Sequence, residues 1–273
     1  MRALLDAWLR RLARSPLRER WILRGGLVTC HHCPSRPAPE DIDLVGLGRF
    51  DEAEARREMR ALALAPASSD ESVTFHSPLS EIIWGDTPLP GLRTTVETTG
   101  AAGPGPRIQI DLGFGDPLDP GPEPLVVGGA SLLAVRAETM IAWKLHGLVE
   151  HGRGRWRAKD LADALLLFRE ASLDAAALDR ALPLAFESRG TDLSATKEFL
   201  EAPTWGQSRG SRRRWATFLK RRPCPLDGDV TVVRDELRRH AAPLIERVSA
   251  RGLARSCERD GTHGEQGPAA KPA

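Results

Sequence analysis

The chain has 273 residues, of which 41% are hydrophobic and 28% charged, as expected for a globular protein with one large or two small domains. Its formal net charge of +2 gives no overall basic excess that would demand nucleic acid as a partner, although a local basic patch remains possible. Four cysteines, no signal-peptide pattern and no apolar run of ~20 residues argue against a disulfide framework or a membrane span and favour the cytoplasm.

The first half of the chain predicts a mixed α/β core. Apolar residues at helical spacing indicate helices, and short alternating or apolar runs bounded by glycine or proline indicate strands. In chain order, the predicted elements are a helix over 2–14, strands over 21–24 and 41–47, a helix over 51–64, a ribbon of short strands within 66–99, a loop over 100–106, a strand over 107–116 and a proline-rich connection over 117–129.

From residue 136 onward the pattern becomes helical. Two amphipathic helices are predicted over 136–151 and 159–171, and others over 174–187, 211–221 and 231–250. The last segment has few apolar residues and no periodicity, which predicts disorder. We therefore expect an α/β core over 1–135, a helical domain that completes the active site over 136–251, and a disordered tail over 252–273.

Residues 30–33, Cys-His-His-Cys, place four potential zinc ligands in a row. Structural zinc sites normally take their ligands from two separated pairs, and four adjacent side chains cannot surround one ion without severe backbone strain. We interpret the segment as part of a helix with small, half-buried cysteines and surface histidines. A zinc-stabilised DNA-binding module remains an alternative that metal analysis of the purified protein would decide.

Asp41 and Asp43 lie two positions apart in a predicted strand. Both carboxylates therefore project from one face, with their Cα atoms ~6–7 Å apart. Such a pair is repulsive unless a cation neutralises it, and Mg²⁺ prefers oxygen ligands together with water and phosphate oxygens. The pair alone is a weak signal, because surface strands often carry alternating acids.

Two nearby features strengthen the prediction of a magnesium–phosphate site. Gly25 and Gly26 end the preceding strand, where glycine lets the backbone approach a triphosphate and the next helix offers free N–H groups. Asp111 lies on the polar side of an otherwise apolar strand. A third acid beside the first two would complete a metal site or act as a base on an attacking hydroxyl. The alternatives are an ordinary tight turn and a solvated edge strand.

The helical half contributes cations. Lys144 lies in an apolar helix, where it either extends its charge to the surface or meets a phosphate. A basic loop before the next helix contains Arg153, Arg155, Arg157, Lys159 and Asp160. The basic run over 208–222 could hold an RNA backbone, with Trp205 or Trp215 available for stacking. A solvated amphipathic helix is the alternative interpretation of that run.

Three blocks in this order resemble the AbiEii/AbiGii toxin nucleotidyltransferases, a branch of the polymerase-β-like nucleotidyltransferase superfamily. The first block has a strand, a Gly-Gly turn, a helix, an arginine and "DIDL"; the second is "IQIDLGFGDPLDP". The third begins "ETMIAWKLHG" and continues to "RAKDLADALLL". The resemblance covers roughly residues 18–250.

The resemblance implies an α+β fold, with a polymerase-β-like mixed sheet, flanking helices and a C-terminal helical region. It also implies Mg²⁺-dependent transfer of a nucleotidyl group from an NTP to an RNA 3′ end, tRNA above all, or to a protein hydroxyl. Such toxins are usually neutralised by an antitoxin encoded beside them.

By position, the resemblance implies a role for each candidate site residue. Asp41 and Asp43 would hold Mg²⁺, with two ions expected, and Asp111 would be the third strand carboxylate. Lys144 would contact the phosphates, and Asp160 would be a second essential acid. The expected nucleotide-binding residues are Gly25, Gly26, Arg36, Arg157 and Lys159. A non-catalytic module on the same fold, binding nucleic acid or protein, is the main alternative, and Mg²⁺-dependent NTP binding would distinguish the two.

Overall fold

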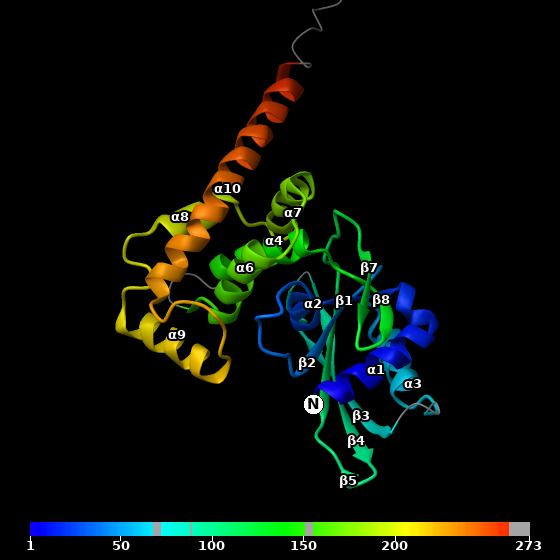
Figure 1. The fold of residues 1–273 in the computed structure, drawn as a ribbon. Coiled ribbons are helices and arrows are strands. Elements are labelled where there is room, and N and C mark those ends of the chain that lie inside the picture. Colours follow the sequence, from blue (N-terminus) through cyan, green and yellow to red (C-terminus); the bar gives the residue numbers. More distant parts are fainter. Residues whose placement is uncertain (68–71, 88, 151–154, 262–273) are drawn as a thin grey trace, which may run out of the picture.

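The structure is a computed structural model that describes residues 1–67, 72–87, 89–150 and 155–261, with only the backbone described over 252–261. Figure 1 shows two parts side by side, a sheet with its covering helices and a helical bundle. The mixed sheet and the C-terminal helical region agree with the fold expected from the sequence.

The sheet is mixed, with the strand order β3-β4-β6-β2-β1-β8-β7 and a short β5 against β4. The pairs β2–β6 and β1–β8 are parallel, and the other pairs are antiparallel. The strands are β1 (Trp21–Arg24), β2 (Asp41–Gly46), β3 (Val73–Ile83), β4 (Gly91–Gly100), β5 (Gly103–Pro104), β6 (Ile108–Phe114), β7 (Glu123–Val127) and β8 (Ala130–Ala134).

Among the described residues, this part contains three α-helices and a short 3-10 helix, η1 (Pro16–Glu19). The helix α1 (Arg2–Arg14) packs against β8, α3 (Glu52–Ala63) packs against β3 and β4, and the two helices contact each other. The helix α2 (Gly25–His32) follows β1 directly and packs against β1 and β2 as well as against the bundle. The alternation predicted for β2 and β6 is confirmed, because the apolar residues face the core and the acids face the other side.

The bundle begins after β8. Its helices are α4 (Ala137–Glu150), α6 (Ala158–Glu170), α7 (Ala175–Glu187), α8 (Ser194–Glu201), α9 (Arg209–Arg221) and α10 (Val230–Gly261). The helix α4 packs between α6 and α7, and α10 packs along α6, α7 and α8 before its end extends away from the body (Figure 1).

Three differences from the sequence prediction are informative. The proline-rich connection over 117–129 contains β7 and leads into β8, and Pro124 is tolerated because β7 is an edge strand of the sheet. The first two short runs of the ribbon form one long strand, β3, which a bulge between His76 and Leu79 interrupts and which pairs antiparallel with β4. The helix α10 continues to Gly261, past the end at 250 that the sequence predicted for this helix, and 262–273 lie outside the described residues.

Candidate active site

A row of four charged residues crosses the middle of the sheet. The strand register pairs Arg24 of β1 with Asp43 of β2, Asp43 with Asp111 of β6, and Asp111 with Arg93 of β4. Residues paired in this way project from the same face of a sheet. Asp41 lies two positions from Asp43 and shares this face, which we call the carboxylate face.

The Gly-Gly turn lies directly against this row. Gly25 has a φ of +70°, and a Cβ atom at this position would lie 2.0 Å from Oδ2 of Asp43. The Gly26 N–H donates to the same oxygen at 3.4 Å. The glycines therefore supply both a backbone conformation that other residues rarely adopt and the space that the carboxylate needs. They bring the N-terminus of α2, with its free N–H groups, next to Asp43.

Asp41 is the carboxylate of this face whose charge and hydrogen-bonding oxygens are least well compensated. Burial raises its pKa, and the charges of Asp43 and Asp111 raise it further. Its Oδ1 atom is buried without a hydrogen-bond partner. A buried, unpartnered carboxylate oxygen is unfavourable, and a bound divalent cation would remove both penalties.

Asp111 differs from the other two acids because it already has a cation. Arg93 donates to both of its oxygens, from Nε at 2.9 Å and from Nη2 at 2.7 Å. Throughout the described part of the chain, no three His, Cys, Asp or Glu side chains converge on one point as a ready metal site. Asp41 and Asp43 therefore fit a Mg²⁺ ion whose other ligands are water and phosphate oxygens, the usual arrangement for this ion.

A second cluster of charges is buried where α2 meets the bundle. Lys144 of α4 lies 2.9 Å from Asp160 and 3.4 Å from Asp163, both on α6. Arg157 pairs with Asp160 at 2.5 Å, and Arg36 pairs with Asp163 at 2.6 Å. The side chains of Asp160 and Asp163 are only 1% and 3% exposed, so both carboxylates depend on the cations paired with them.

The pKa values of the cluster follow from this pairing. Burial alone would raise the pKa of Asp160 and Asp163, but the neighbouring cations, Lys144 first, hold both pKa values below their usual range. The same pairing raises the pKa of Lys144 despite its burial. All three side chains are therefore charged at neutral pH.

The cluster positions three of the predicted site residues inside the protein. Arg36 is 7% exposed and also donates to the carbonyl oxygens of Pro37 at 3.0 Å and Gly26 at 3.4 Å. It thereby fastens the loop before β2, and the first turn of α2, to the bundle. Lys144 and Asp160 are occupied with each other, and direct contact of either with a nucleotide remains a prediction. Arg153 lies outside the described residues.

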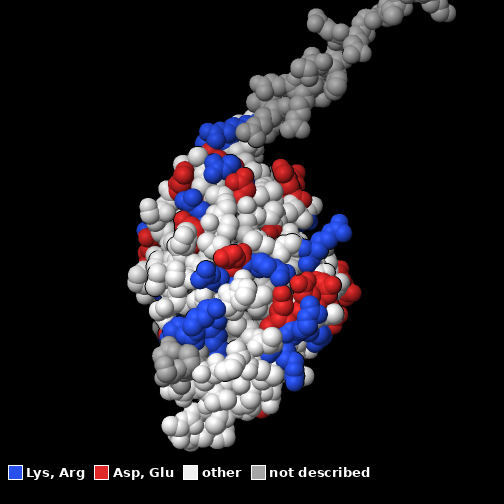
Figure 2. All heavy atoms as spheres, turned by 90° about the vertical axis from the view of Figure 1, so that its right-hand side faces the viewer, with Lys and Arg blue, Asp and Glu red and all other residues white. Residues whose placement is uncertain are grey.

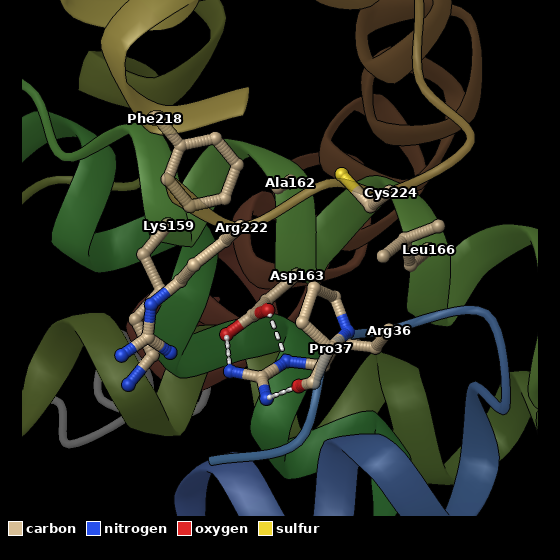
Figure 3. A pocket seen from close by; sticks show the side chains of 9 residues that line it. All are labelled: Arg36, Pro37, Lys159, Ala162, Asp163, Leu166, Phe218, Arg222 and Cys224. Atoms are coloured by element: carbon tan, nitrogen blue, oxygen red, sulfur yellow. Dashed lines mark hydrogen bonds and ion pairs between the residues drawn. The ribbon is translucent and has the colours of Figure 1, made fainter. Parts of the chain in front are cut away.

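Two other cations lie at a small pocket beside this cluster. The pocket is bounded by the loop at Arg36, by α6 and by the end of α9. Lys159 and Arg222 both line it (Figure 3). The positive charges of both lower the pKa of Asp41, so they lie near the carboxylate face. No carboxylate of the described residues forms an ion pair with either, which leaves them free for an anion.

Cys30, His31 and His32 form the end of α2 and Cys33 is its C-cap, so the helical interpretation is confirmed for the first three residues of the segment. The Cys30 thiol donates to the carbonyl oxygen of Pro37 at 3.2 Å. Cys33 is fully buried, and burial raises its pKa to about 12. Zinc binds the thiolate form of cysteine, which the surroundings of Cys33 disfavour.

We expect Cys33 to resist alkylation in the folded protein. At pH 8 its thiolate form is rare, because the pKa is about 12, and only the thiolate reacts. Mass spectrometry after treatment with iodoacetamide at pH 8 should find Cys33 unmodified in native protein and modified in urea. Equal modification in both conditions would contradict the buried thiol.

The prediction that Trp205 or Trp215 stacks on bases is wrong. Trp205 is 3% exposed and packs against Trp156 and Phe199, and Trp215 is fully buried. The Trp215 Nε1–H donates to the Asp227 carbonyl oxygen at 2.9 Å. Both indoles belong to the core of the bundle, while the arginines of α9 at 212–214 are exposed.

Sequence reasoning missed three charged residues that support the site. Arg93 carried no signal, since its partnership with Asp111 depends on strand register. Asp163 stood in the quoted "KDLAD" spacing, three residues after Asp160, and its helical period could have identified it. Asp116 accepts from Arg24 at 2.7 Å and pairs with Arg189, which connects the end of β6 to β1 and to the bundle.

Within the described residues, no helix is long and apolar enough to cross a membrane. Among curated proteins, no relative matches the sequence. The solved structures that align with it include two at 16% identity. JHP933 from Helicobacter pylori has a TM-score of 0.49 and covers 94% of this chain and 95% of its own. An antigenic nucleotidyltransferase-like protein from Paracoccidioides brasiliensis has a TM-score of 0.39 and covers 71% and 92%.

The sequence profile of one family matches residues 7–227, which include the whole sheet, the Gly-Gly turn and the buried charge cluster. That family is described as nucleotidyl transferase AbiEii toxin, type IV toxin–antitoxin system. The match covers most of the chain and confirms both the resemblance and the enzyme class expected from the sequence. The chain therefore belongs to the AbiEii family of nucleotidyl transferase toxins of type IV toxin–antitoxin systems.

Proposed function

We propose that this nucleotidyltransferase moves a nucleotidyl group from an NTP to a hydroxyl at an RNA 3′ end, with tRNA as the preferred acceptor, in a Mg²⁺-dependent reaction. The observation that carries the proposal is the contact between the Gly-Gly turn and the Asp41–Asp43 pair. It combines free backbone N–H groups, a buried carboxylate oxygen without a partner and two acids on one face.

Each part of the NTP has a matching group. Asp41 and Asp43 would hold Mg²⁺, which when bound supplies positive charge to the α-phosphate and the leaving pyrophosphate. The N–H groups at the start of α2 would approach the phosphate chain. Lys159 and Arg222, free of carboxylate partners among the described residues, would neutralise its outer charges.

The reaction is a displacement at phosphorus. The oxygen of the acceptor hydroxyl attacks the α-phosphorus, and a bond forms between them as the bond from the α-phosphorus to the bridging oxygen breaks. Pyrophosphate leaves with the electron pair of that bond. We assign the hydroxyl proton to Asp111, which is next to Asp43 on the carboxylate face and would accept it on an oxygen that Arg93 releases.

The surface of α9 supports RNA as the acceptor. Its exposed arginines at 212–214 continue toward Arg222 at the pocket, so a polyanion bound along α9 would lead to the nucleotide site. On the face that carries α1, β7 and β8, Figure 2 shows clusters of both signs beside one another, a pattern that suits RNA less well. The cytoplasm, where RNA and NTPs occur together, is the expected location, and an antitoxin protein is the expected partner.

The acceptor and the NTP can be identified in one experiment. Purified protein is incubated with total RNA, Mg²⁺ and each of the four NTPs in turn, labelled at the α-phosphate. We expect label in RNA of tRNA size with one NTP preferred. If the label appears on protein, the acceptor is a protein hydroxyl and not RNA. If the label appears on neither, the proposed function is refuted.

Asp41→Asn is expected to raise the melting temperature in the absence of Mg²⁺. The substitution removes a half-buried charge that burial and two neighbouring acids disfavour. A raised carboxyl pKa means that ionised Asp41 costs stability above that pKa, and the cost disappears as the pH falls through it. The gain should therefore shrink at acidic pH, as thermal melts from pH 8 to pH 4 would show. An unchanged or lower melting temperature at pH 8 would contradict the claim that ionised Asp41 destabilises the metal-free protein.

A further inference from the structure

All seven tryptophans lie in the described part of the chain, and Trp84 is the one whose side chain is exposed. It is 45% exposed, whereas Trp143 is partly buried and the others are 3% exposed or less. A large aromatic side chain left open to solvent is informative in a protein that buries its other indoles. Its position relative to the carboxylate face decides what it could do.

The Trp84 indole lies on the carboxylate face, beside the row of charges. Gly91 of β4 and Gly113 of β6 are paired, and each lies two positions from Arg93 or Asp111. A Cβ atom on Gly91 would lie 3.1 Å from Cε3 of Trp84, and one on Gly113 would lie 3.3 Å from its Cζ3. The two paired glycines thus make a flat surface that the Trp84 ring covers. This surface lies two residues along the strands from Arg93 and Asp111, a distance of ~6–7 Å.

The backbone and the neighbours hold the ring in this place. Trp84 has a φ of +57°, a conformation that is rare for a bulky residue and is found where surrounding structure enforces it, often at functional sites. Its carbonyl oxygen accepts from the Thr87 N–H at 2.9 Å and from the Thr87 hydroxyl at 2.8 Å, which closes the turn after β3.

Arg24 fixes one side of the ring. Its guanidinium carbon is 5.8 Å from the centre of the Trp84 ring and 5.6 Å from that of Trp143 on α4. Asp116 holds the same guanidinium at 2.7 Å. An exposed aromatic surface with a planar cation beside it is the kind of platform on which nucleobases stack, largely without regard to their sequence.

We propose that Trp84, with the Arg24 guanidinium close to its ring, is the stacking platform for a nucleobase at the active site. The base belongs either to the NTP or to the 3′-terminal nucleotide of the acceptor, the two substrates that the carboxylate face must bring together. This inference rests on the proposed function and gives the site the aromatic surface that Trp205 and Trp215 cannot provide.

The test compares Trp84→Ala with Trp84→Phe, which keeps an aromatic ring. Val126→Ala, an exposed apolar residue on the edge strand β7 that is 65% exposed, serves as the matched control. Calorimetry with Mg²⁺ measures binding of each NTP and of inorganic tripolyphosphate, which has no base. A short RNA is compared with the same RNA carrying an abasic 3′ end. Circular dichroism verifies that each variant is folded.

If the platform holds the donor base, Trp84→Ala should weaken NTP binding roughly 5- to 150-fold, the range for loss of one stacked base. Tripolyphosphate binding should not change, and Trp84→Phe should retain most of the affinity. If it holds the acceptor base, the loss should appear with intact RNA and not with abasic RNA. In both cases Val126→Ala should bind as the wild type does.

Two outcomes would overturn the proposal while the proposed function stands. One is a Trp84→Ala protein that binds NTP and RNA as tightly as the wild type does. The other is an equal loss of NTP and tripolyphosphate binding, which would assign Trp84 to the phosphate site or to the fold. Wild-type protein that binds neither NTP nor RNA would refute the proposed function, and this inference with it.

Discussion

Replacing Asp43 by asparagine should lower the rate of nucleotidyl transfer by a factor on the order of 10³ or more, the effect of several kcal/mol of lost charge stabilisation at a metal site. The amide has the shape of the carboxylate and keeps an oxygen for the Gly26 N–H, so the turn should survive. What it lacks is the negative charge that a divalent cation requires. Initial rates of label transfer, measured with saturating Mg²⁺, report the loss.

Glu40→Gln is the matched control for this substitution. Glu40 is exposed, precedes Asp41 by one residue and lies outside β2, so the variant removes one negative charge near the site without touching the carboxylate face. It should transfer at close to the wild-type rate. Equal rates for Asp43→Asn and the wild type would disprove the metal role of Asp43, and equal losses in both variants would indicate a general effect of charge.

Replacing Asp163 by alanine should destabilise the protein by about 3–5 kcal/mol, the cost of removing one partner from a buried ion pair. The substitution leaves the Arg36 guanidinium, with a side chain only 4% exposed, without its carboxylate. It also removes one of the two acids beside Lys144. For a chain of this size, the melting temperature should fall by about 6–20 °C, as differential scanning calorimetry would record.

Asp179→Ala provides the comparison for Asp163→Ala. Asp179 also pairs with two cations, Arg247 and Arg251, but those side chains are 40% and 59% exposed and can return to water. Surface pairs of this kind contribute about 0–1 kcal/mol, so the melting temperature should change little. A loss for Asp163→Ala no larger than that for Asp179→Ala would show that the buried cluster does not join the two parts of the protein.

The features that the sequence predicted well are local ones. The alternation of β2 and β6, the Gly-Gly turn and the helix predicted over 51–64 depend on residues that are neighbours in the chain, and local periodicity reports them directly. The link between turn and acids was also predictable, because a strand, a tight turn and a short helix bring Gly25 and Asp43 back together within one supersecondary unit.

The features that the sequence did not predict depend on tertiary register and burial. Arg93 neutralises Asp111 only because β4 and β6 pair in one particular register, and nothing in either segment encodes that register locally. Trp215 lies in a strongly basic run and still faces the core, since its helix presents the arginines on one side and the indole on the other. The strand β7 was not predicted because it contains proline. Proline is tolerated there because β7 is an edge strand, where one side of the backbone needs no hydrogen-bond partner.

The most direct test of the carboxylate face as a nucleotidyl-transfer site follows two phosphorus labels. Wild-type protein is incubated with RNA, Mg²⁺ and the preferred NTP, labelled at either the α- or the γ-phosphate. We expect the α-label to enter RNA and the γ-label to appear in pyrophosphate, with both signals lost in Asp43→Asn. Transfer of the γ-label to RNA, or undiminished α-label transfer by Asp43→Asn, would contradict the assignment.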